Sequence, residues 1–174
     1  MLAITVDTRE RRPLLFPSHL PVLQGHPSCR HSTRVVPVAV SVRTLETGDY
    51  ASEGSPVVVE RKGSLQEIQG NCIGDDRPRF LRALDRLAAA AHPILLLEGT
   101  PADLLTATPR TPNPHLVMDA FLRDVYERGI RLLVLPTKTI DQRRAAGELV
   151  ARIFWNSALV HSSQTAPPQK EPAA

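Results

Sequence analysis

The chain has 174 residues, enough for one domain with a full hydrophobic core and too few for a second domain of ordinary size. Hydrophobic residues make up 42% and charged residues 22%, which is typical of globular proteins, and no apolar run approaches the ~20 residues of a membrane span. The formal charge is +3, and 18 of the 21 basic residues are arginine. Arginine favours an anionic partner because its guanidinium group binds two phosphate oxygens at once, although a GC-rich coding sequence produces the same composition.

The two cysteines and the lack of a secretory leader predict a cytoplasmic protein in a reducing compartment. His26, Cys29 and His31 are residue types that bind zinc. Their spacing is irregular, and a zinc site would need a fourth ligand such as Cys72. We therefore interpret this segment as a polar loop.

The first predicted element is a strand over residues 2–6, which ends where Asp7 begins a charged stretch. We expect Asp7 to lie at the edge of a sheet and to face solvent or a cleft. Arg9 and Arg11 follow it. They either contact phosphate or an acidic neighbour, or are simply solvated.

Residues 13–33 contain four prolines and show no steady hydrophobic period, so they predict an irregular connection. Alternation resumes over residues 35–45, with a valine at every second position from 36 to 42. Pro37 indicates an edge strand or the start of a strand. We expect this strand to pair with residues 57–60.

A predicted β-hairpin joins Asp49 to Glu60. Residues 51–56 supply the turn, and the three consecutive valines at 57–59 form a short buried strand. The hairpin would bring the two carboxylates side by side.

Side chains alternate along a strand, so Glu60 and Lys62 share one face while Arg61 points to the other. Two carboxylates, from Asp49 and Glu60, are hard oxygen ligands that suit Mg²⁺, and a lysine beside them can orient or deprotonate the attacking water. This combination is what a metal-dependent phosphodiesterase needs. Glu-x-Lys at a strand end is also common on solvated surfaces, so the pattern is a hypothesis.

A short helix beginning at Ser64 carries Glu67 towards this site. A second helix is predicted over residues 76–91, with an apolar stripe on one face. Arginines at i, i+3 and i+7 line another face, from Arg79 to Arg86. They either contact DNA or form a solvated surface.

The second half of the chain alternates strands and helices. Apolar strands are predicted at 93–99 and 130–135, and helices at 114–128 and 139–153. Glu98, near the end of the first strand, is either a cleft carboxylate or part of an ion pair. This order predicts an α/β fold, a central mixed sheet flanked by helices on both faces.

Three ordered blocks of sequence resemble one family. They are Val6-Asp7-Thr8-Arg9-Glu10, then Gly48-Asp49 with Glu60-Arg61-Lys62, and Asp76-Arg77-Pro78-Arg79-Phe80. Together they resemble the XPF-type structure-specific endonucleases, a branch of the restriction-endonuclease-like PD-(D/E)xK superfamily. The resemblance implies that fold, with a stand-alone nuclease domain over residues 1–160. Residues 161–174 are rich in Ser, Gln, Pro and Ala, and this composition predicts a disordered tail.

The resemblance also assigns roles to ten residues. The catalytic residues are Asp7, Asp49, Glu60 and Lys62, and the three acids among them hold the metal. Supporting residues are Arg9, Glu10, Arg61 and Glu67, while Arg77 and Arg79 contact DNA. The family has an aspartate four residues after the lysine, where this chain has Gln66. We expect Glu67 to take that role, as if Gly63 were an insertion.

The implied function is a Mg²⁺- or Mn²⁺-dependent DNA endonuclease that acts on branched or flapped DNA in repair or recombination. Without a DNA-binding module of its own, it would reach its substrate as a homodimer, through a partner subunit, or through its arginines. The alternative is a catalytically inactive scaffold that binds DNA or an active partner nuclease, which the retained acids and lysine disfavour. A third interpretation, an unrelated α/β binding domain, requires all three blocks to match by coincidence.

Overall fold

The computed structural model describes residues 1–24 and 32–165, and in this part of the chain seven strands form one mixed sheet. Their order across the sheet is β2-β3-β1-β4-β5-β6-β7. The strands are β1 (Leu2–Asp7), β2 (His19–Gln24), β3 (Ser32–Arg43), β4 (Tyr50–Ser52), β5 (Val57–Lys62), β6 (His92–Glu98) and β7 (Arg131–Leu135). The mixed sheet expected from the sequence is confirmed.

The strand directions bring several strand ends together. β3 is parallel to β1, while β1 and β5 both lie antiparallel to β4, and β6 and β7 continue parallel to β5. The carboxyl ends of β1, β5 and β6 therefore reach the same edge of the sheet, at the point where β4 begins.

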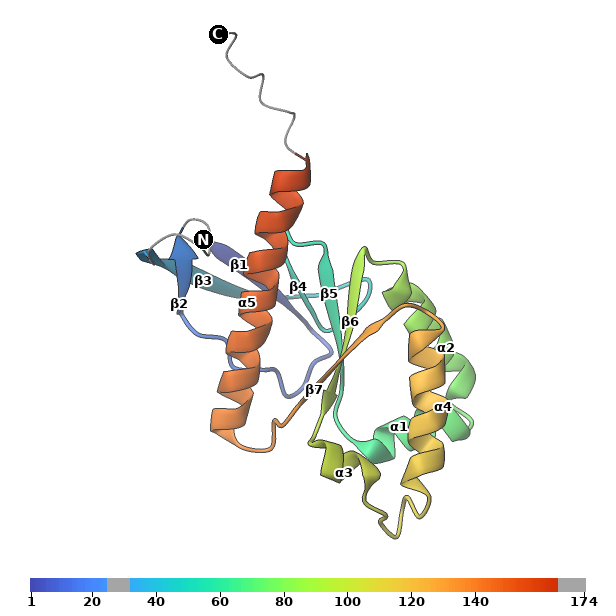
Figure 1. Ribbon diagram of the computed structural model, residues 1–174. Helices are drawn as coiled ribbons and strands as arrows, with labels where there is room; N and C mark the ends of the chain where they lie inside the picture. Colours follow the sequence, from blue (N-terminus) through green and yellow to red (C-terminus); the bar gives the residue numbers. More distant parts are fainter. Residues whose placement is uncertain (25–31, 166–174) are drawn as a thin grey trace, which may run out of the picture.

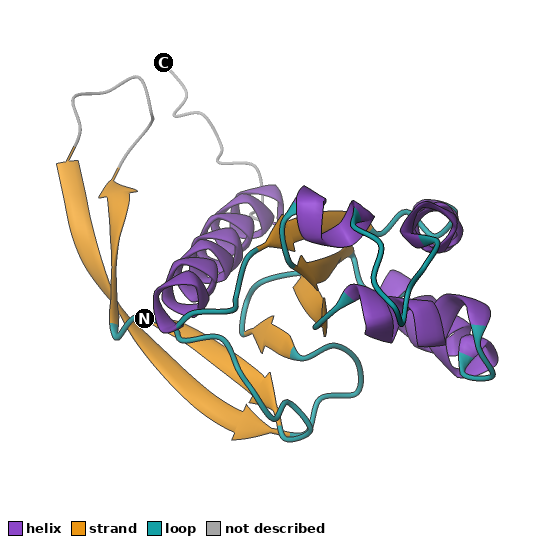
Figure 2. Ribbon diagram, turned by 90° about the horizontal axis from the view of Figure 1, so that it is seen from below, coloured by secondary structure: helices purple, strands orange, loops and turns teal. Residues whose placement is uncertain are grey.

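Helices cover both faces of this sheet, as predicted. They are α1 (Leu65–Ile73), α2 (Arg77–Ala88), α3 (Pro101–Leu105), α4 (Pro114–Tyr126) and α5 (Ile140–Thr165). Figure 1 shows α5 on one side of the sheet and α1, α2 and α4 on the other. In Figure 2 the β2 and β3 strands project beyond the remaining strands. No helix in the described part of the chain is both long and apolar enough to cross a membrane.

Each face of the sheet has its own hydrophobic core. Val59 and Leu96 face α5, where Phe154 is fully buried. Leu95 and Leu97 point the other way, into the core formed with α1, α2 and α4. Because β6 is buried on both faces, its run of apolar residues is continuous rather than alternating.

The last helix begins as predicted and ends later than predicted. Thr139 and Gln142 form a capping box, in which the Thr139 N–H donates to Gln142 Oε1 (3.1 Å) and the Gln142 N–H donates to Thr139 Oγ1 (3.2 Å). The helix continues to Thr165, so residues 161–165 are helical rather than part of the expected disordered tail. Residues 166–174 lie outside the described part.

Two expectations for the first half of the chain are wrong. Residues 13–33 are not wholly irregular, because they contain β2, an edge strand in which a proline at position 21 is tolerated. β3 pairs with β1 and β2 rather than with β5, whose hairpin partner is the three-residue β4. Hydrophobic alternation identifies the faces of a strand but not its neighbours. The zinc-like segment 26–31 lies outside the described residues.

Candidate active site

The two central carboxylates meet at the edge of the sheet where β5 ends and β4 begins. Gly48 positions Asp49 there. Its φ is +76°, and a Cβ at this position would lie 2.5 Å from Val58 Cγ1, so the turn requires glycine. The Asp49 N–H donates to the Val59 carbonyl (2.8 Å), and Asp49 Oδ2 accepts the Arg61 N–H (2.7 Å). These bonds fix Asp49 to the β5 backbone on either side of the neighbouring Glu60.

Glu60 and Lys62 lie on the same face of β5, as predicted. Lys62 Nζ donates to Glu60 Oε1 (3.0 Å) and lies 3.5 Å from Glu67 Oε1. The ammonium also lies 5.9 Å from the ring centroid of Phe80. Only 13% of the Lys62 side chain is exposed, so its direction is set by these partners.

Burial and neighbouring charges shift the pKa values of Asp49 and Lys62. Burial, together with the negative charge of Glu60, raises the pKa of Asp49 to about 7. Burial alone would lower the pKa of Lys62, but the carboxylates of Glu60 and Glu67 outweigh burial and raise it. Lys62 is therefore an ammonium at neutral pH, while the buried Asp49 lies close to the negative charge of Glu60.

Arg61 points to the opposite face of β5 and links the ends of β5 and β6 to the segment that follows β1. Its Nε and Nη2 donate to the two oxygens of Glu10 at 2.7 and 2.9 Å, and its Nη1 donates to Glu98. The side chains of Arg61, Glu10 and Glu98 are only 14%, 4% and 14% exposed. Glu98 is thus part of an ion pair, one of the two roles its position allowed. The network holds the ends of β5 and β6 against the segment that follows β1.

Asp7 is buried, which corrects the expectation that it faces solvent or a cleft. Its Oδ1 accepts hydrogen bonds from Arg9 Nε (2.6 Å) and from the Arg9 N–H (2.8 Å). Its Oδ2 accepts from Arg9 Nη2 (3.0 Å) and from the Leu45 N–H (2.7 Å). The Arg9 guanidinium, helped by the backbone donors, holds the pKa of Asp7 well below its usual range despite burial. Asp7 orients Arg9, and direct metal binding by Asp7 stays a prediction.

Glu67 reaches the site from the first turn of α1. Its Oε2 accepts the Gly63 N–H at 2.8 Å, while its Oε1 is the carboxylate oxygen near Lys62. The preceding residue, Gln66, instead accepts a hydrogen bond from Arg110 (3.2 Å). This arrangement favours Glu67 over Gln66 as the additional acid of the site.

The two arginines expected to contact DNA have different surroundings. Arg77 donates to both oxygens of Asp124 (2.7 and 3.0 Å) and to the Cys72 carbonyl (2.9 Å), so it ties α2 to α4. Arg79 instead lines the cleft that contains Glu60. DNA contact by either arginine stays a prediction, and the geometry favours Arg79.

The cleft itself has a volume of 350 Å³ and lies between β5 and the helices α1 and α2. Arg86, for which both DNA contact and a solvated face were open, lines it. The sequence did not single out Asn71 as a site residue, although it too lines the cleft. Asn71 lies four residues after Glu67, which places both side chains on one face of the helix. This spacing is the sequence feature that could have identified Asn71.

The donor set fits a hard divalent cation. The described residues contain no group of three or more histidine, cysteine or acidic side chains that could hold a metal ion. Mg²⁺ commonly needs only one or two carboxylates, because water and substrate phosphate complete its shell. Asp49 and Glu60 provide two such oxygens. Burial first, and then the negative charge of Glu60, raise the pKa of Asp49, and a bound cation would offset both effects.

Two solved structures with a similar fold are of XPF from Aeropyrum pernix. One matches 99% of this chain and 68% of that chain, with a TM-score of 0.60 and 19% sequence identity. The other is a complex with DNA and matches 98% of this chain and 70% of that chain, with a TM-score of 0.55 and 21% identity. This chain has the fold of XPF from Aeropyrum pernix.

At this identity the likeness establishes the fold alone. The resemblance to XPF that the three sequence blocks suggest is thereby confirmed for the architecture, a restriction-endonuclease-like mixed sheet flanked by helices. No family model matches the sequence, and the comparison with curated proteins found no match. The chemistry of the cleft therefore follows from its own residues.

Proposed function

We propose that this protein is a metal-dependent endonuclease that hydrolyses phosphodiester bonds in DNA. The observation that carries the proposal is the meeting of Asp49, Glu60 and Lys62 in one cleft at the carboxyl edge of the sheet. DNA as the substrate is supported by the XPF complex with DNA and by Arg79 and Arg86 on the wall of the cleft.

In this proposal Asp49 and Glu60 hold Mg²⁺ or Mn²⁺. When bound, the metal lowers the pKa of a coordinated water and neutralises charge on the phosphate. Lys62 keeps its proton on Nζ, as its raised pKa favours, and donates a hydrogen bond to a phosphate oxygen on which negative charge develops. Glu67 keeps the Lys62 ammonium directed into the cleft, where Glu60 already binds it.

We also propose branched or flapped DNA, in repair or recombination, as the physiological substrate. This step rests on the resemblance of the Gly-Asp and Glu-Arg-Lys block to structure-specific endonucleases. A homodimer or a partner subunit would supply further DNA contacts. On α4, the exposed apolar side chains of Leu116 and Tyr126 are the candidates for such an interface. Asp49, Glu60 and Lys62 in the cleft disfavour the alternative, an inactive scaffold.

The proposal is tested by incubating the purified protein with flap, fork and Holliday-junction DNA in Mg²⁺, Mn²⁺ or EDTA. We expect nicks that carry a 5′-phosphate, formed only with metal and faster on branched DNA than on linear duplex. Failure to cut any of these substrates with either metal would contradict the proposal and favour the scaffold.

A further inference from the structure

The second half of β3 is a free strand edge. β3 has 12 residues, but β2 covers only its first half, because the register between the two strands ends with His19 opposite Pro37. The segment from Ala39 to Arg43 therefore pairs with β1 on one side and has no strand on the other. In Figure 2 this half of β3 forms the outer border of the sheet.

The backbone groups of this edge point away from the sheet. The Val38 N–H donates to the carbonyl of Ser18, which precedes β2 (2.9 Å). Because backbone groups alternate in direction along a strand, the N–H and C=O groups of Val40 and Val42 point to that same side. Among residues 1–24 and 32–165, none forms a hydrogen bond with these groups. A further strand would pair with all of them.

The side chains along this edge are apolar and exposed. Val40 and Val42 lie on the α5 face of the sheet, beside the buried Ile4 and Val6 of β1. Their exposed fractions are 49% and 67%. The hydrophobic face of the sheet thus continues to its free edge, where a further strand would cover both valines.

The adjoining edge of β2, by contrast, is closed to pairing. Pro21 lies at its centre and has no N–H to donate. The Pro21 carbonyl already accepts a hydrogen bond from Arg152 Nη1 of α5 (3.0 Å). Residues 39–42 contain neither a proline nor a charged side chain, the two features that commonly protect an edge strand. Strand pairing is therefore directed to the second half of β3.

We propose that this edge pairs in antiparallel fashion with the same edge of a second copy of the chain. Ser41 lies opposite Ser41 of the second copy, and Val40 of each copy exchanges hydrogen bonds with Val42 of the other. In this register Arg43 lies opposite Ala39. Apolar side chains meet apolar ones, and no like charges face each other, so the edge is complementary to itself as a two-fold interface requires.

The free edge also has the length that this pairing needs. It begins after Pro37, where β2 ends. It ends at Arg43, because the Leu45 N–H donates to Asp7 Oδ2 (2.7 Å) and directs the chain back towards β1. The two-fold axis is perpendicular to the sheet, so the clefts of both copies open on the same face of one continuous sheet.

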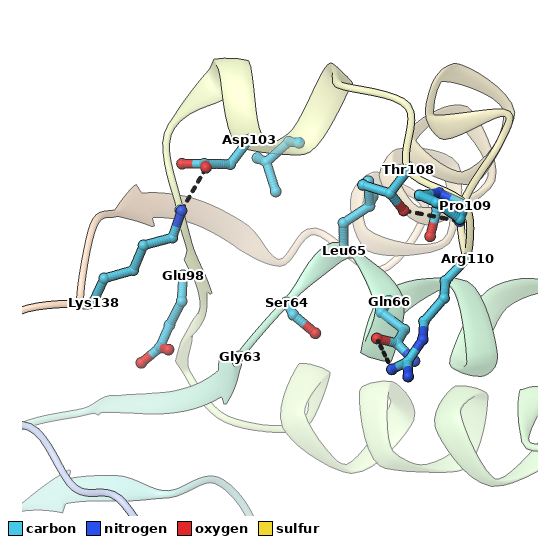
Figure 3. Close-up of a pocket in the computed structure, with 13 residues that line it drawn as sticks. Gly63, Ser64, Leu65, Gln66, Glu98, Asp103, Thr108, Pro109, Arg110 and Lys138 are labelled. Carbon is cyan, nitrogen blue, oxygen red and sulfur yellow. Dashed lines mark hydrogen bonds and ion pairs between the residues drawn. The ribbon is translucent and has the colours of Figure 1, made fainter.

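The proposed interface is separate from the other candidate surfaces. The hollow of 460 Å³ in Figure 3 is lined by residues at the ends of β5 and β6 and by Lys138 after β7, all on the far side of β4 from β3. α4 packs on that same half of the molecule. A dimer formed through β3 therefore leaves α4 free for a partner subunit, and the inference does not rest on the proposed nuclease chemistry.

The first test is a disulfide between the two copies. Residues opposite each other in a non-hydrogen-bonded pair have Cα atoms ~4.5 Å apart, within the ~4.4–6.8 Å that a disulfide spans. In a Cys29→Ser background, where the remaining Cys72 is buried, we expect Ser41→Cys to form a linked dimer at least about tenfold faster than Val35→Cys under mild oxidation.

Val35→Cys is the matched control. Val35 lies on the same face of β3 as Ser41, beside β2, and is 63% exposed, whereas Ser41 is half-buried. Random collision would therefore favour the control. Equal or slower linkage of Ser41→Cys would overturn the inference.

The second test measures association without a crosslink. Sedimentation velocity of the full chain is recorded over a range of concentrations, without DNA or metal. We expect the wild type to dimerise and Val42→Lys to lower the association constant at least about tenfold, because a lysine on an edge strand opposes pairing. Leu116→Lys on α4, at a side chain that is 63% exposed, is the control and should dimerise like the wild type. A monomeric wild type, or a dimer lost in Leu116→Lys and kept in Val42→Lys, would overturn the inference.

Discussion

Burial and a neighbouring negative charge disfavour the ionised form of Asp49 when no cation is bound. Its pKa lies at about 7 instead of the ordinary 3.8, chiefly because the side chain is buried and then because Glu60 is negative. Between these two values the folded protein binds a proton that the unfolded chain has released. The contribution of this group to stability is therefore greatest below about pH 4 and is lost as the pH rises to about 7.

This shift predicts the behaviour of Asp49→Asn. We expect the metal-free variant to be more stable than the wild type at pH 8, on the order of a few kcal/mol in the free energy of unfolding, with the difference shrinking towards pH 5. The Asn side chain keeps an oxygen that can accept the Arg61 N–H. Urea unfolding in EDTA at several pH values measures the effect. Asp141→Asn, at a side chain that is 90% exposed, is the control and should show no such pH dependence. A variant less stable than the wild type at pH 8 would contradict the account.

A second prediction at this scale concerns the acid that follows Lys62. Glu67→Gln removes the negative charge near the ammonium while keeping the side chain's shape, so we expect cleavage to slow about 10- to 100-fold. Gln66→Ala should slow cleavage less, because Gln66 bonds Arg110 and does not reach Lys62. Single-turnover rates on one flap substrate compare the two variants. If Gln66→Ala slows cleavage more than Glu67→Gln does, the active site uses one fewer acid and Glu67 has another role.

At the scale of secondary structure, Arg61 links β5 to β6 and to the segment that follows β1. Glu10 follows β1 and Glu98 ends β6, and both pair with this one guanidinium. Arg61→Met leaves two buried carboxylates without their counter-ion, so we expect a loss of about 3–5 kcal/mol in the free energy of unfolding. Adding Glu10→Gln and Glu98→Gln to that variant should recover part of the lost free energy of unfolding. Urea unfolding of the single and combined variants measures it, and additive losses would show that the network does not act as a unit.

α2 carries the two arginines whose roles the structure separates. Arg77→Ala breaks the pair with the buried Asp124 and should lower stability, with little change in the salt dependence of duplex binding. Arg79→Ala should leave stability unchanged and lower the slope of log K against log salt by about 0.9, one duplex phosphate contact. Thermal unfolding and a salt titration of DNA binding distinguish the two. An equal fall in slope for both variants would restore the simpler interpretation that both contact DNA.

Elements were predictable from the sequence where local pattern determines them. The buried strand at 93–99, the capping box at Thr139 and the opposite directions of Glu60 and Arg61 all follow from spacing along the chain. Pairing was not predictable, because β3 and β1 are joined across 24 residues of intervening chain and no local pattern selects that neighbour. The burial of Asp7 and the partner of Arg77 depend on where distant segments pack, which is a property of the assembled fold.

At the scale of the whole molecule, the site exists only when the XPF-like sheet is assembled. The turn at Gly48 and the end of β5 supply the carboxylates and the lysine, while α1 and α2 close the cleft. These segments lie within residues 46–86, yet their relative positions depend on β6 and on α4, which pack against them from the second half of the chain. The central claim is that this assembly cleaves DNA with a metal held by Asp49 and Glu60 and a phosphate contact from Lys62.

The most direct test of that claim is the cleavage rate of one flap DNA by the wild type, Asp49→Asn, Lys62→Ala and the control Arg131→Ala, with Mg²⁺ or EDTA. We expect the wild type and the control to cut only with Mg²⁺, and both site variants to lose at least about 100-fold in rate while remaining folded. Asp49→Asn should also bind Mg²⁺ more weakly, whereas Lys62→Ala should bind it normally, because only the carboxylate is a ligand. Robust cutting by Lys62→Ala, or wild-type cutting that survives EDTA, would contradict the mechanism.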